Sequence, residues 1–201
     1  AEYVRIPYAD NGLTRIPDHV TDEQALFNGD LLSTGYWAAK LGEIRNGDTV
    51  AVIGAGPAGL CTMLCARLYA PSCIIAIDTD LYRLNLAKEK GLADITLVPG
   101  KDLVEKGIRE LTEGRGADVV IEAAGGKDTF QLAWEIARPN ANVVVAAMYE
   151  ESQILPLPEM YGKNLVFKTG GVDGCYCQEI MDLTAEGKLD ASFLITHRCS
   201  F

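Results

Sequence analysis

Three glycines with GxGxxG spacing follow an apolar run in the stretch TVAVIGAGPAGL, residues 49–60. Gly54 permits a tight turn, Gly56 lets the backbone approach a pyrophosphate, and Gly59 allows a helix to pack closely on the preceding strand. Pro57 occupies the first turn of the expected helix, where a proline sacrifices no internal hydrogen bond. The amides and dipole of that helix N-terminus stabilise a diphosphate. The loop therefore predicts a dinucleotide-binding site.

Asp78 is the second candidate, because it ends the apolar run CIIAID 19 residues after Gly59. An aspartate at the end of the second strand accepts the hydroxyl pair of the adenosine ribose, and its charge repels a 2′-phosphate. This favours NAD over NADP, with Arg83 covering the ribose or adenine edge. Two alternatives stay open: Arg83 could pair with a phosphate, and Asp78 could only cap the helix that begins near Asp80.

The elements that must position these residues alternate short β-rich runs with amphipathic helical runs, a pattern typical of a parallel sheet covered on both faces. We expect helices between the β-rich runs. The expected strands are 49–53, 73–77, 95–98, 118–122, 142–147 and 165–169. The sequence therefore predicts an α/β fold, a Rossmann doubly wound six-stranded parallel sheet. The alternating run near the N-terminus and the β-rich run LDASFLITHRCSF near the C-terminus are predicted to be parts of another unit.

Composition narrows the possible partners. The 201 residues carry a net charge of −10, and the 18 Lys and Arg residues form no run, which argues against nucleic acid. No apolar stretch approaches the roughly 20 residues that cross a bilayer. The first ten residues lack a secretory signal pattern. These features predict a cytoplasmic protein without a membrane partner.

The six cysteines match no zinc ribbon or finger. Cys61 and Cys65 stand one helical turn apart in an apolar segment, which favours buried thiols over a redox pair. Cys175 and Cys177 in GCYCQE would need outside ligands to hold a metal, and the chain has only two histidines.

Two other enzyme classes share parts of these motifs. Flavoproteins carry the string VIGAGPAGL, but usually at the chain start, with Glu ending the second strand and a later Gly-Asp motif, and none of these holds here. Tyr36 and Lys40 form the YxxxK pair of short-chain dehydrogenases, but they precede the glycine loop instead of following it. We therefore expect Tyr36 and Lys40 to be ordinary helix residues.

A longer set of strings fits one family in order. The stretch DLLSTGYWAAKLGEIRNGDTVAVIGAGPAGL, with AEYVRIPYAD upstream and GRGADVVIEAAG and GKLDASFLITH downstream, resembles the zinc-dependent medium-chain alcohol dehydrogenase family, which includes alcohol, sorbitol and threonine dehydrogenases. The resemblance covers essentially the whole chain. It implies that residues 1–22 end a GroES-like catalytic domain and its crossover, residues 23–188 form the NAD-binding Rossmann domain, and residues 189–201 begin the return to the catalytic domain.

The resemblance also implies site residues. Thr34 would face the nicotinamide, Ala123 and Ala124 the adenosine half, and four residues of the last two strands the carboxamide. The full cofactor-binding set is Thr34, Gly54, Gly56, Pro57, Ala58, Gly59, Asp78, Arg83, Ala123, Ala124, Val145, Ala146, Phe167 and Thr169.

Asp30 stands where the family places its late catalytic zinc ligand, and zinc would polarise the oxygen of a small-molecule alcohol. The family's early Cys ligand, GHE segment, structural zinc loop and proton relay have no counterpart here, and one carboxylate cannot hold zinc. Asp30 as a helix N-cap is the alternative. The chain is therefore expected to bind NAD without oxidising alcohol by itself; the competing hypothesis is a stand-alone NAD-sensing regulatory module.

Quaternary structure is the last expectation from the resemblance. The family pairs an edge strand across a dimer axis, which here would lie near Ile154 to Pro158 in a homodimer or tetramer. Pro156 and Pro158 limit the edge hydrogen bonds available.

Overall fold

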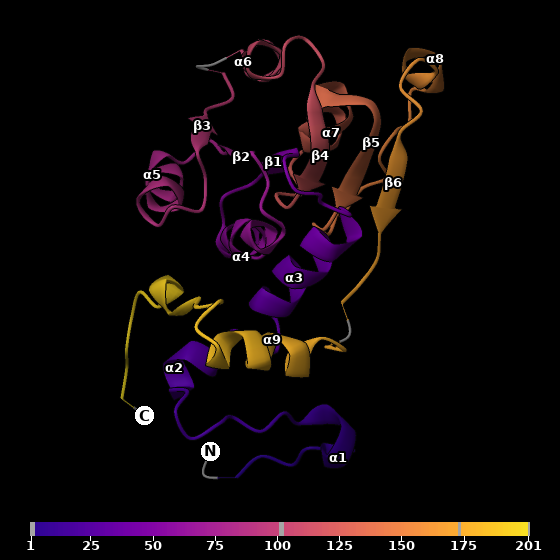
Figure 1. The fold of residues 1–201 in the computed structure, drawn as a ribbon. Helices are drawn as coiled ribbons and strands as arrows, with labels where there is room; N and C mark the ends of the chain where they lie inside the picture. Colours follow the sequence, from indigo (N-terminus) through magenta and orange to yellow (C-terminus); the bar gives the residue numbers. More distant parts are fainter. Residues whose placement is uncertain (1–2, 101–102, 173, 201) are drawn as a thin grey trace.

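A six-stranded parallel sheet in the order β3-β2-β1-β4-β5-β6 forms the centre of the molecule (Figure 1). The computed structural model describes residues 3–100, 103–172 and 174–200. The strands are β1 Thr49–Ile53, β2 Cys73–Ile77, β3 Ile95–Leu97, β4 Ala117–Glu122, β5 Ala137–Val145 and β6 Val166–Thr169. This is the strand order of a doubly wound dinucleotide-binding fold, so the predicted fold class is confirmed.

Strand β1 shows why the sheet is covered on both faces. All five of its residues are buried. Val50 and Val52 point into one hydrophobic cluster, while Ala51 and Ile53 point into the other. Since successive side chains of a strand alternate between faces, an unbroken apolar strand needs a helical layer on each side.

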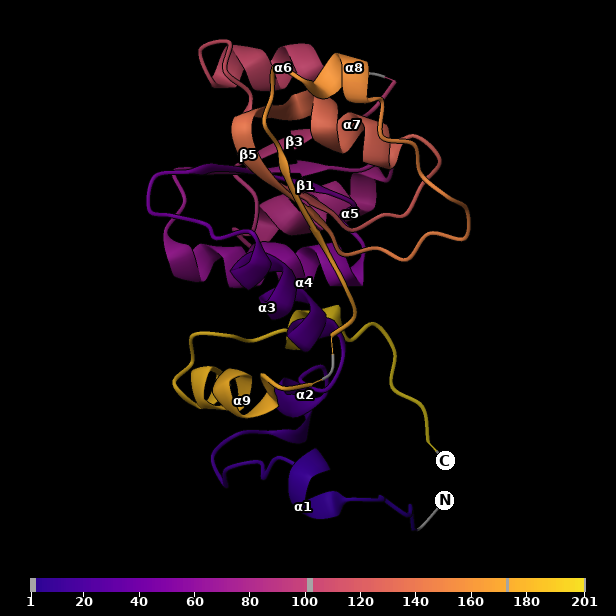
Figure 2. The same cartoon turned by 90° about the vertical axis from the view of Figure 1, so that its right-hand side faces the viewer.

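Two helical layers supply this cover (Figures 1 and 2). The cluster on the first face includes side chains of α3 Leu31–Leu41, α4 Pro57–Ala66, α5 Leu81–Glu89 and α9 Cys177–Ala185. The cluster on the second face includes side chains of α6 Val104–Leu111 and α7 Thr129–Ile136. The shorter elements are α1 Ala9–Gly12, α2 Asp22–Ala25, α8 Leu157–Met160 and the 3-10 turns Arg67–Tyr69 and Ser192–Leu194.

Helix α3 packs closely against α4. A Cβ atom added to Gly35 of α3 would lie 2.5 Å from the carbonyl carbon of Cys61 in α4, so only glycine permits this approach. Because α4 follows the glycine loop, this contact holds the loop's helix against the body of the protein.

Several expected elements differ from the structure. The fifth strand begins at Ala137, directly after α7, and ends at Val145 rather than Ala147. The described part of the N-terminal segment, residues 3–22, contains no strand, and neither do residues 189–200. The alternating pattern alone could not make these segments strands, since a strand needs a neighbour for its hydrogen bonds and no described strand lies beside them.

The expected edge strand near Ile154 to Pro158 is also wrong. Residues 152–156 form no strand, and helix α8 begins at Leu157 directly after Pro156. Proline donates no ladder hydrogen bond but is tolerated in the first turn of a helix, which accounts for the difference. The edge strand on this side of the sheet is β6 instead.

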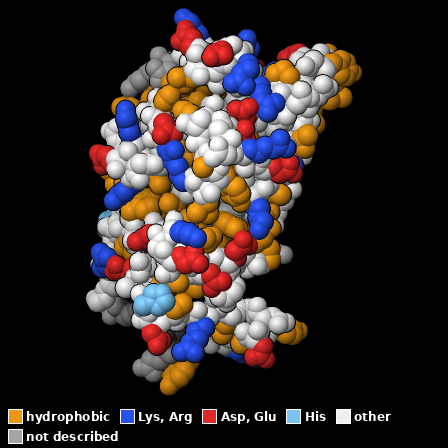
Figure 3. All heavy atoms as spheres, viewed as in Figure 1, with side chains coloured by type: hydrophobic (Ala, Val, Ile, Leu, Met, Phe, Trp, Pro, Cys, Tyr) orange, Lys and Arg blue, Asp and Glu red, His pale blue; other side chains and the backbone are white. Residues whose placement is uncertain are grey.

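The surface carries charges of both signs. On the face in Figure 3, basic and acidic side chains lie interspersed, and an apolar patch covers the projecting α8 region. Within the described residues, no helix has the length and apolar character needed to span a membrane.

Candidate functional site

The glycine loop lies at the carboxyl end of β1 and is shaped by close backbone contacts. The Gly54 N–H donates to the Ile77 carbonyl oxygen at 2.7 Å, and Gly54 has a φ of 97°, a value that favours glycine. A Cβ atom on Gly59 would lie 1.9 Å from the Gly54 oxygen. A Cβ atom on Gly56 would meet only one atom within 4 Å, a guanidinium nitrogen of Arg83. Gly54 and Gly59 are therefore needed for packing, while Gly56 faces open space.

Helix α4 begins in this loop as the sequence predicts. Pro57 is its first residue, and Gly56 is its N-cap in an extended conformation. The first amides of an α-helix lack intrahelical acceptors. These amides and the positive end of the helix dipole thus lie beside the open face of Gly56, where an anionic group is stabilised.

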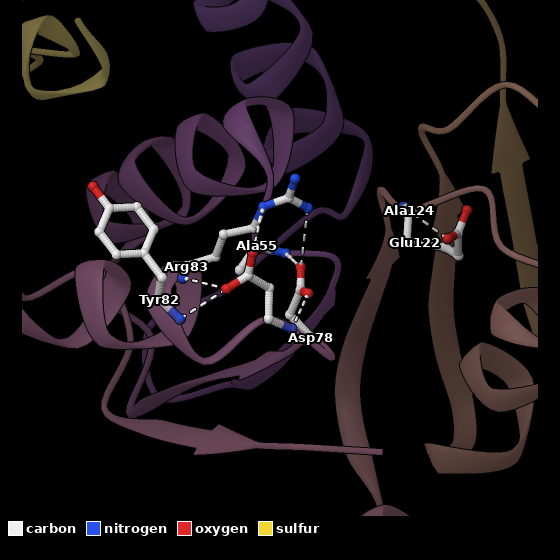
Figure 4. Close-up of polar contacts among 7 residues, drawn as sticks. Ala55, Asp78, Tyr82, Arg83, Glu122 and Ala124 are labelled. Atoms are coloured by element: carbon white, nitrogen blue, oxygen red, sulfur yellow. Dashed lines mark hydrogen bonds and ion pairs between the residues drawn. The ribbon is translucent and has the colours of Figure 1, made fainter. Parts of the chain in front are cut away.

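Asp78 follows β2 and connects two segments of the site (Figure 4). Its Oδ2 accepts the Ala55 N–H at 2.6 Å, and its Oδ1 accepts the Asp80 N–H at 2.8 Å. The cap of α5 is Asp80, whose Oδ1 accepts the Tyr82 N–H at 2.8 Å. The alternative that Asp78 caps α5 is therefore wrong, and its carboxylate instead holds the glycine loop.

Arg83 lies beside the same carboxylates. Its Nη1 atom is 3.9 Å from Asp78 Oδ2, and its Nε atom is 3.6 Å from Asp80 Oδ2. The Arg83 side chain is about half exposed. It can therefore move toward a ligand at modest cost, since exposed ion pairs contribute little.

A cleft of about 700 Å³ opens at this end of the sheet. It lies outside the ends of β1 and β4, where the strand order reverses and where such folds bind their ligands. Of the expected cofactor residues, those that line it are Gly54, Gly56, Asp78, Arg83, Ala123 and Ala124. Lys127, Asp128, Thr129, Gln131 and Glu135 also line it, and the sequence analysis missed them. No spacing rule marks these five, because they belong to the loop after β4 and the solvent side of α7.

The remaining expected residues do not line this cleft. Pro57, Ala58 and Gly59 lie in the first turn of α4, and Thr34 lies in α3. The expected cofactor residues at the ends of β5 and β6 lie together, because the Thr169 hydroxyl donates to the Val145 carbonyl oxygen at 3.1 Å. The Ala146 N–H donates to the Glu122 carbonyl oxygen at 2.8 Å, and the Phe167 ring packs on Phe130.

Asp30 occupies the N-cap position of α3, but its side chain makes no capping hydrogen bond and is exposed. The described residues hold no cluster of three or more His, Cys, Asp or Glu side chains that could bind a metal. Zinc needs about four ligands, three of them usually from protein in a catalytic site. The residues described here therefore do not fit a zinc ion.

Cys61 and Cys65 are buried thiols, as predicted. Burial, with a smaller contribution from the Asp30 charge, raises the pKa of Cys61 to about 12. Burial also raises the pKa of Cys65. Both groups therefore remain neutral and unreactive in the native protein.

The YxxxK pair forms a contact between helices, and neither residue lines the cleft. The Tyr36 hydroxyl donates to Glu179 Oε1 at 2.6 Å, and Lys40 Nζ lies 3.3 Å from Glu179 Oε2. This cluster joins α3 to α9. Both residues are ordinary helix residues, as expected.

Comparisons with known proteins agree with this geometry. The sequence profile of the family described as zinc-binding dehydrogenase matches residues 57–193. An alcohol dehydrogenase of Cupriavidus necator is 37% identical, over 98% of this chain and 55% of its own length. The NADP-dependent isopropanol dehydrogenase of Thermoanaerobacter brockii is 33% identical, over 98% of this chain and 57% of its own length.

A solved structure shows the same fold. The alcohol dehydrogenase TADH from Thermus sp. ATN1 superposes with a TM-score of 0.87 and 34% identity, covering 96% of this chain and 56% of that one. The chain thus spans about half the length of the relatives it matches. It belongs to the zinc-dependent medium-chain alcohol dehydrogenase family and corresponds to the cofactor-binding portion of its members.

Proposed function

We propose that this chain binds NAD(H) in the cleft at the ends of β1, β2 and β4. The observation that carries the proposal is the position of Asp78, whose carboxylate holds the Ala55 amide of the glycine loop and lines the cleft. The pyrophosphate would lie at the open face of Gly56 and the N-terminus of α4. The adenosine ribose would then lie within reach of Asp78.

The electrostatics of Asp78 favour NAD over NADP. Each of its oxygens already accepts one backbone N–H, and a carboxylate oxygen can accept a second hydrogen bond from a ribose hydroxyl. A 2′-phosphate would bring a doubly negative group against this carboxylate. Arg83 can offset part of that repulsion, and one relative is NADP-dependent by name. Titration with both cofactors measures the preference.

We further propose that the longer protein oxidises a small alcohol. The bound nicotinamide ring supplies a hydride acceptor. The chain's part is to bind and orient the dinucleotide, with Thr34, Ala58, Val145, Ala146, Phe167 and Thr169 on the path from α4 to the nicotinamide end. Residues 1–22 and 189–201 would belong to the catalytic domain, and residues 23–188 to the cofactor domain. Because the described residues do not fit zinc, we expect no alcohol turnover by this chain alone.

The α8 region supports a homo-oligomer. Ile154 is 81% exposed and Tyr161 is 76% exposed, and both precede β6 in the chain, which is an edge strand of the sheet. An exposed apolar patch beside a sheet edge favours association with a second copy. We propose that the dimer forms here, through β6 and the segment before it.

Calorimetric titration with NADH and NADPH tests the cofactor proposal. We expect micromolar NADH binding by the wild-type chain and much weaker NADPH binding. Asp78→Ala removes charge-assisted hydrogen bonds and should weaken NADH binding by roughly tenfold to a hundredfold. It should also reduce the preference for NADH over NADPH, because the repulsive charge is gone.

Asp118→Ala is the matched control. The Asp118 carboxylate accepts the Thr49 N–H at 2.8 Å, so it holds the opposite end of β1 as Asp78 holds the loop. The control should lower stability without changing the ratio of the two affinities. Equal binding of both cofactors by the wild-type chain would contradict the assignment of Asp78.

A further inference from the structure

Glu122 ends strand β4 and is fully buried. Its Oε1 atom accepts the N–H groups of Ala124 and Gly125, each at 2.9 Å. Its Oε2 atom is also buried and has no hydrogen-bond partner among the described residues. A buried carboxyl group with one oxygen unpaired is costly. This position therefore calls for an explanation beyond packing.

The side chain shapes the turn that follows β4. Gly125 has a φ of 65°, and a Cβ atom there would lie 2.9 Å from the Met148 carbonyl oxygen. On the other side of the turn, a Cβ atom on Gly54 would lie 3.0 Å from the backbone of Ala123. The turn is thus clamped between the glycine loop and the segment after β5. Figure 4 shows Glu122 and Ala124 across from Asp78 and Arg83.

The main chain of Glu122 also holds the segment after β5. Its carbonyl oxygen accepts the N–H groups of Ala146 at 2.8 Å and Ala147 at 3.1 Å, just after β5. One residue therefore receives four backbone N–H groups, two from each of the loops that follow β4 and β5. Both loops lie at the carboxyl ends of the strands, where the cleft opens.

Tyr149 lies beside the turn that Glu122 holds. Its hydroxyl lies 2.9 Å from the Thr129 hydroxyl, and Thr129 lines the cleft. Burial, together with the nearby negative charge of Glu122, raises the pKa of Tyr149 to about 12. The phenol therefore remains protonated and lies within electrostatic reach of the Glu122 carboxylate.

We propose that Glu122 is a positioning residue for the dinucleotide cleft: its carboxylate fixes the turn 123–126, whose Ala123, Ala124 and Gly126 form the cleft wall facing Asp78. The inference rests on the proposed function, since it assumes that the cleft binds a dinucleotide. Glu122 is not itself among the residues that line the cleft, although Ala124, whose N–H it accepts, is. Its effect on binding is exerted through the two amides it holds.

Three substitutions of Glu122 separate geometry from charge. Glu122→Gln keeps an acceptor oxygen at the same reach and loses the charge. Glu122→Asp keeps the charge but shortens the side chain by one methylene. Glu122→Ala removes the acceptor. We expect the NADH dissociation constant to rise at least tenfold in E122A and about fivefold in E122D, but to stay within threefold of wild type in E122Q.

Glu179→Ala is the control for a general loss of stability. Glu179 holds α9 to α3 through Tyr36 and Lys40 and does not line the cleft. E179A should melt at a lower temperature and bind NADH like wild type. Hydrogen exchange of the Ala124 and Gly125 amides, measured by NMR without nucleotide, should be at least tenfold faster in E122A and unchanged in E179A.

The outcomes are distinct. Wild-type NADH binding that E122A leaves unchanged, or that E122Q weakens as much as E122A does, would overturn the inference alone. If E122A does not fold, E122D binding as tightly as E122Q would overturn it. Failure of the wild-type chain to bind any nucleotide would overturn the proposed function and this inference together.

Discussion

Alanine substitutions at Gly59 and Gly56 are predicted to have opposite effects on stability, although both glycines belong to the same loop. In Gly59→Ala, the new Cβ atom would lie 1.9 Å from the Gly54 oxygen and 2.8 Å from its carbonyl carbon. The first distance is about 1.6 Å short of the roughly 3.5 Å at which heavy atoms come into contact. Neither partner is a side chain that can rotate away. The N-terminus of α4 must therefore separate from β1.

The magnitude follows from overpacking in a rigid core, which typically costs about 1–3 kcal/mol. Two backbones must move, so the upper end, about 3 kcal/mol, applies. For a chain of this length, each kcal/mol lowers the melting temperature by roughly 2–4 °C. Gly59→Ala should therefore melt about 6–12 °C below wild type and bind NADH weakly at any temperature.

Gly56→Ala should keep its stability. Gly56 has a φ of −68° and an extended ψ, which alanine adopts without strain, and the only atom near the new Cβ would be a guanidinium nitrogen 3.8 Å away. We expect a change in unfolding free energy within about 0.5 kcal/mol. The added methyl group would occupy the open face where we propose that the pyrophosphate lies. NADH binding should fall at least tenfold.

Thermal denaturation followed by circular dichroism, and calorimetric titration with NADH, measure both effects on both variants. The reasoning is refuted if Gly59→Ala melts like wild type, because the close contact would then not exist. It is equally refuted if Gly56→Ala binds NADH as tightly as wild type, because the pyrophosphate would then not lie against this loop.

Three other predictions concern the scaffold. Lys163 Nζ donates to the carbonyl oxygens of Trp134, Glu135 and Ala137 at the end of α7. Lys163→Met should therefore lower the free energy of unfolding, measured by urea denaturation, by about 2 kcal/mol. An unchanged denaturation midpoint would contradict this role. The hydrogen bond from Tyr36 and the charge of Lys40 lower the pKa of Glu179 below 4.5. The ionised Glu179 side chain therefore stabilises the folded state above pH 4.5, and this contribution disappears as the pH falls through the folded-state pKa. Glu179→Gln should then lose less stability than wild type between pH 6 and pH 3. Because Cys61 and Cys65 are buried and neutral, a thiol reagent should modify them only after unfolding, and labelling of the native protein would show that α4 opens locally.

Much of the site was predictable because it depends on local conformation. The glycine spacing specifies a tight strand-to-helix turn, and it appears at residues 54–59 with Pro57 opening the helix. Asp78 was identified from its place at the end of an apolar run. Whether Asp78 caps α5 or binds the glycine loop could not be predicted from the local sequence, because the Ala55 amide that it accepts lies 23 residues away.

The assignment of residues 1–22 and 189–201 to another unit stays a prediction. The described residues 3–22 and 189–200 form no strand, because a strand needs a neighbouring strand for its hydrogen bonds. The segment near Pro156 was expected to be an edge strand, but its two prolines suit a helix start instead.

The sequence by itself determined the parallel sheet, the glycine loop and the acidic residue beside it, because apolar periodicity and glycine conformation are properties of short segments. Only the tertiary structure decided which wall faces that loop. In the sequence, Glu122 is simply an acidic residue that follows an apolar run. Its role can be recognised only once β4 is placed between β1 and β5. Burial then removes water from its carboxylate, and the nearest remaining donors are backbone amides of the loop that closes the cleft.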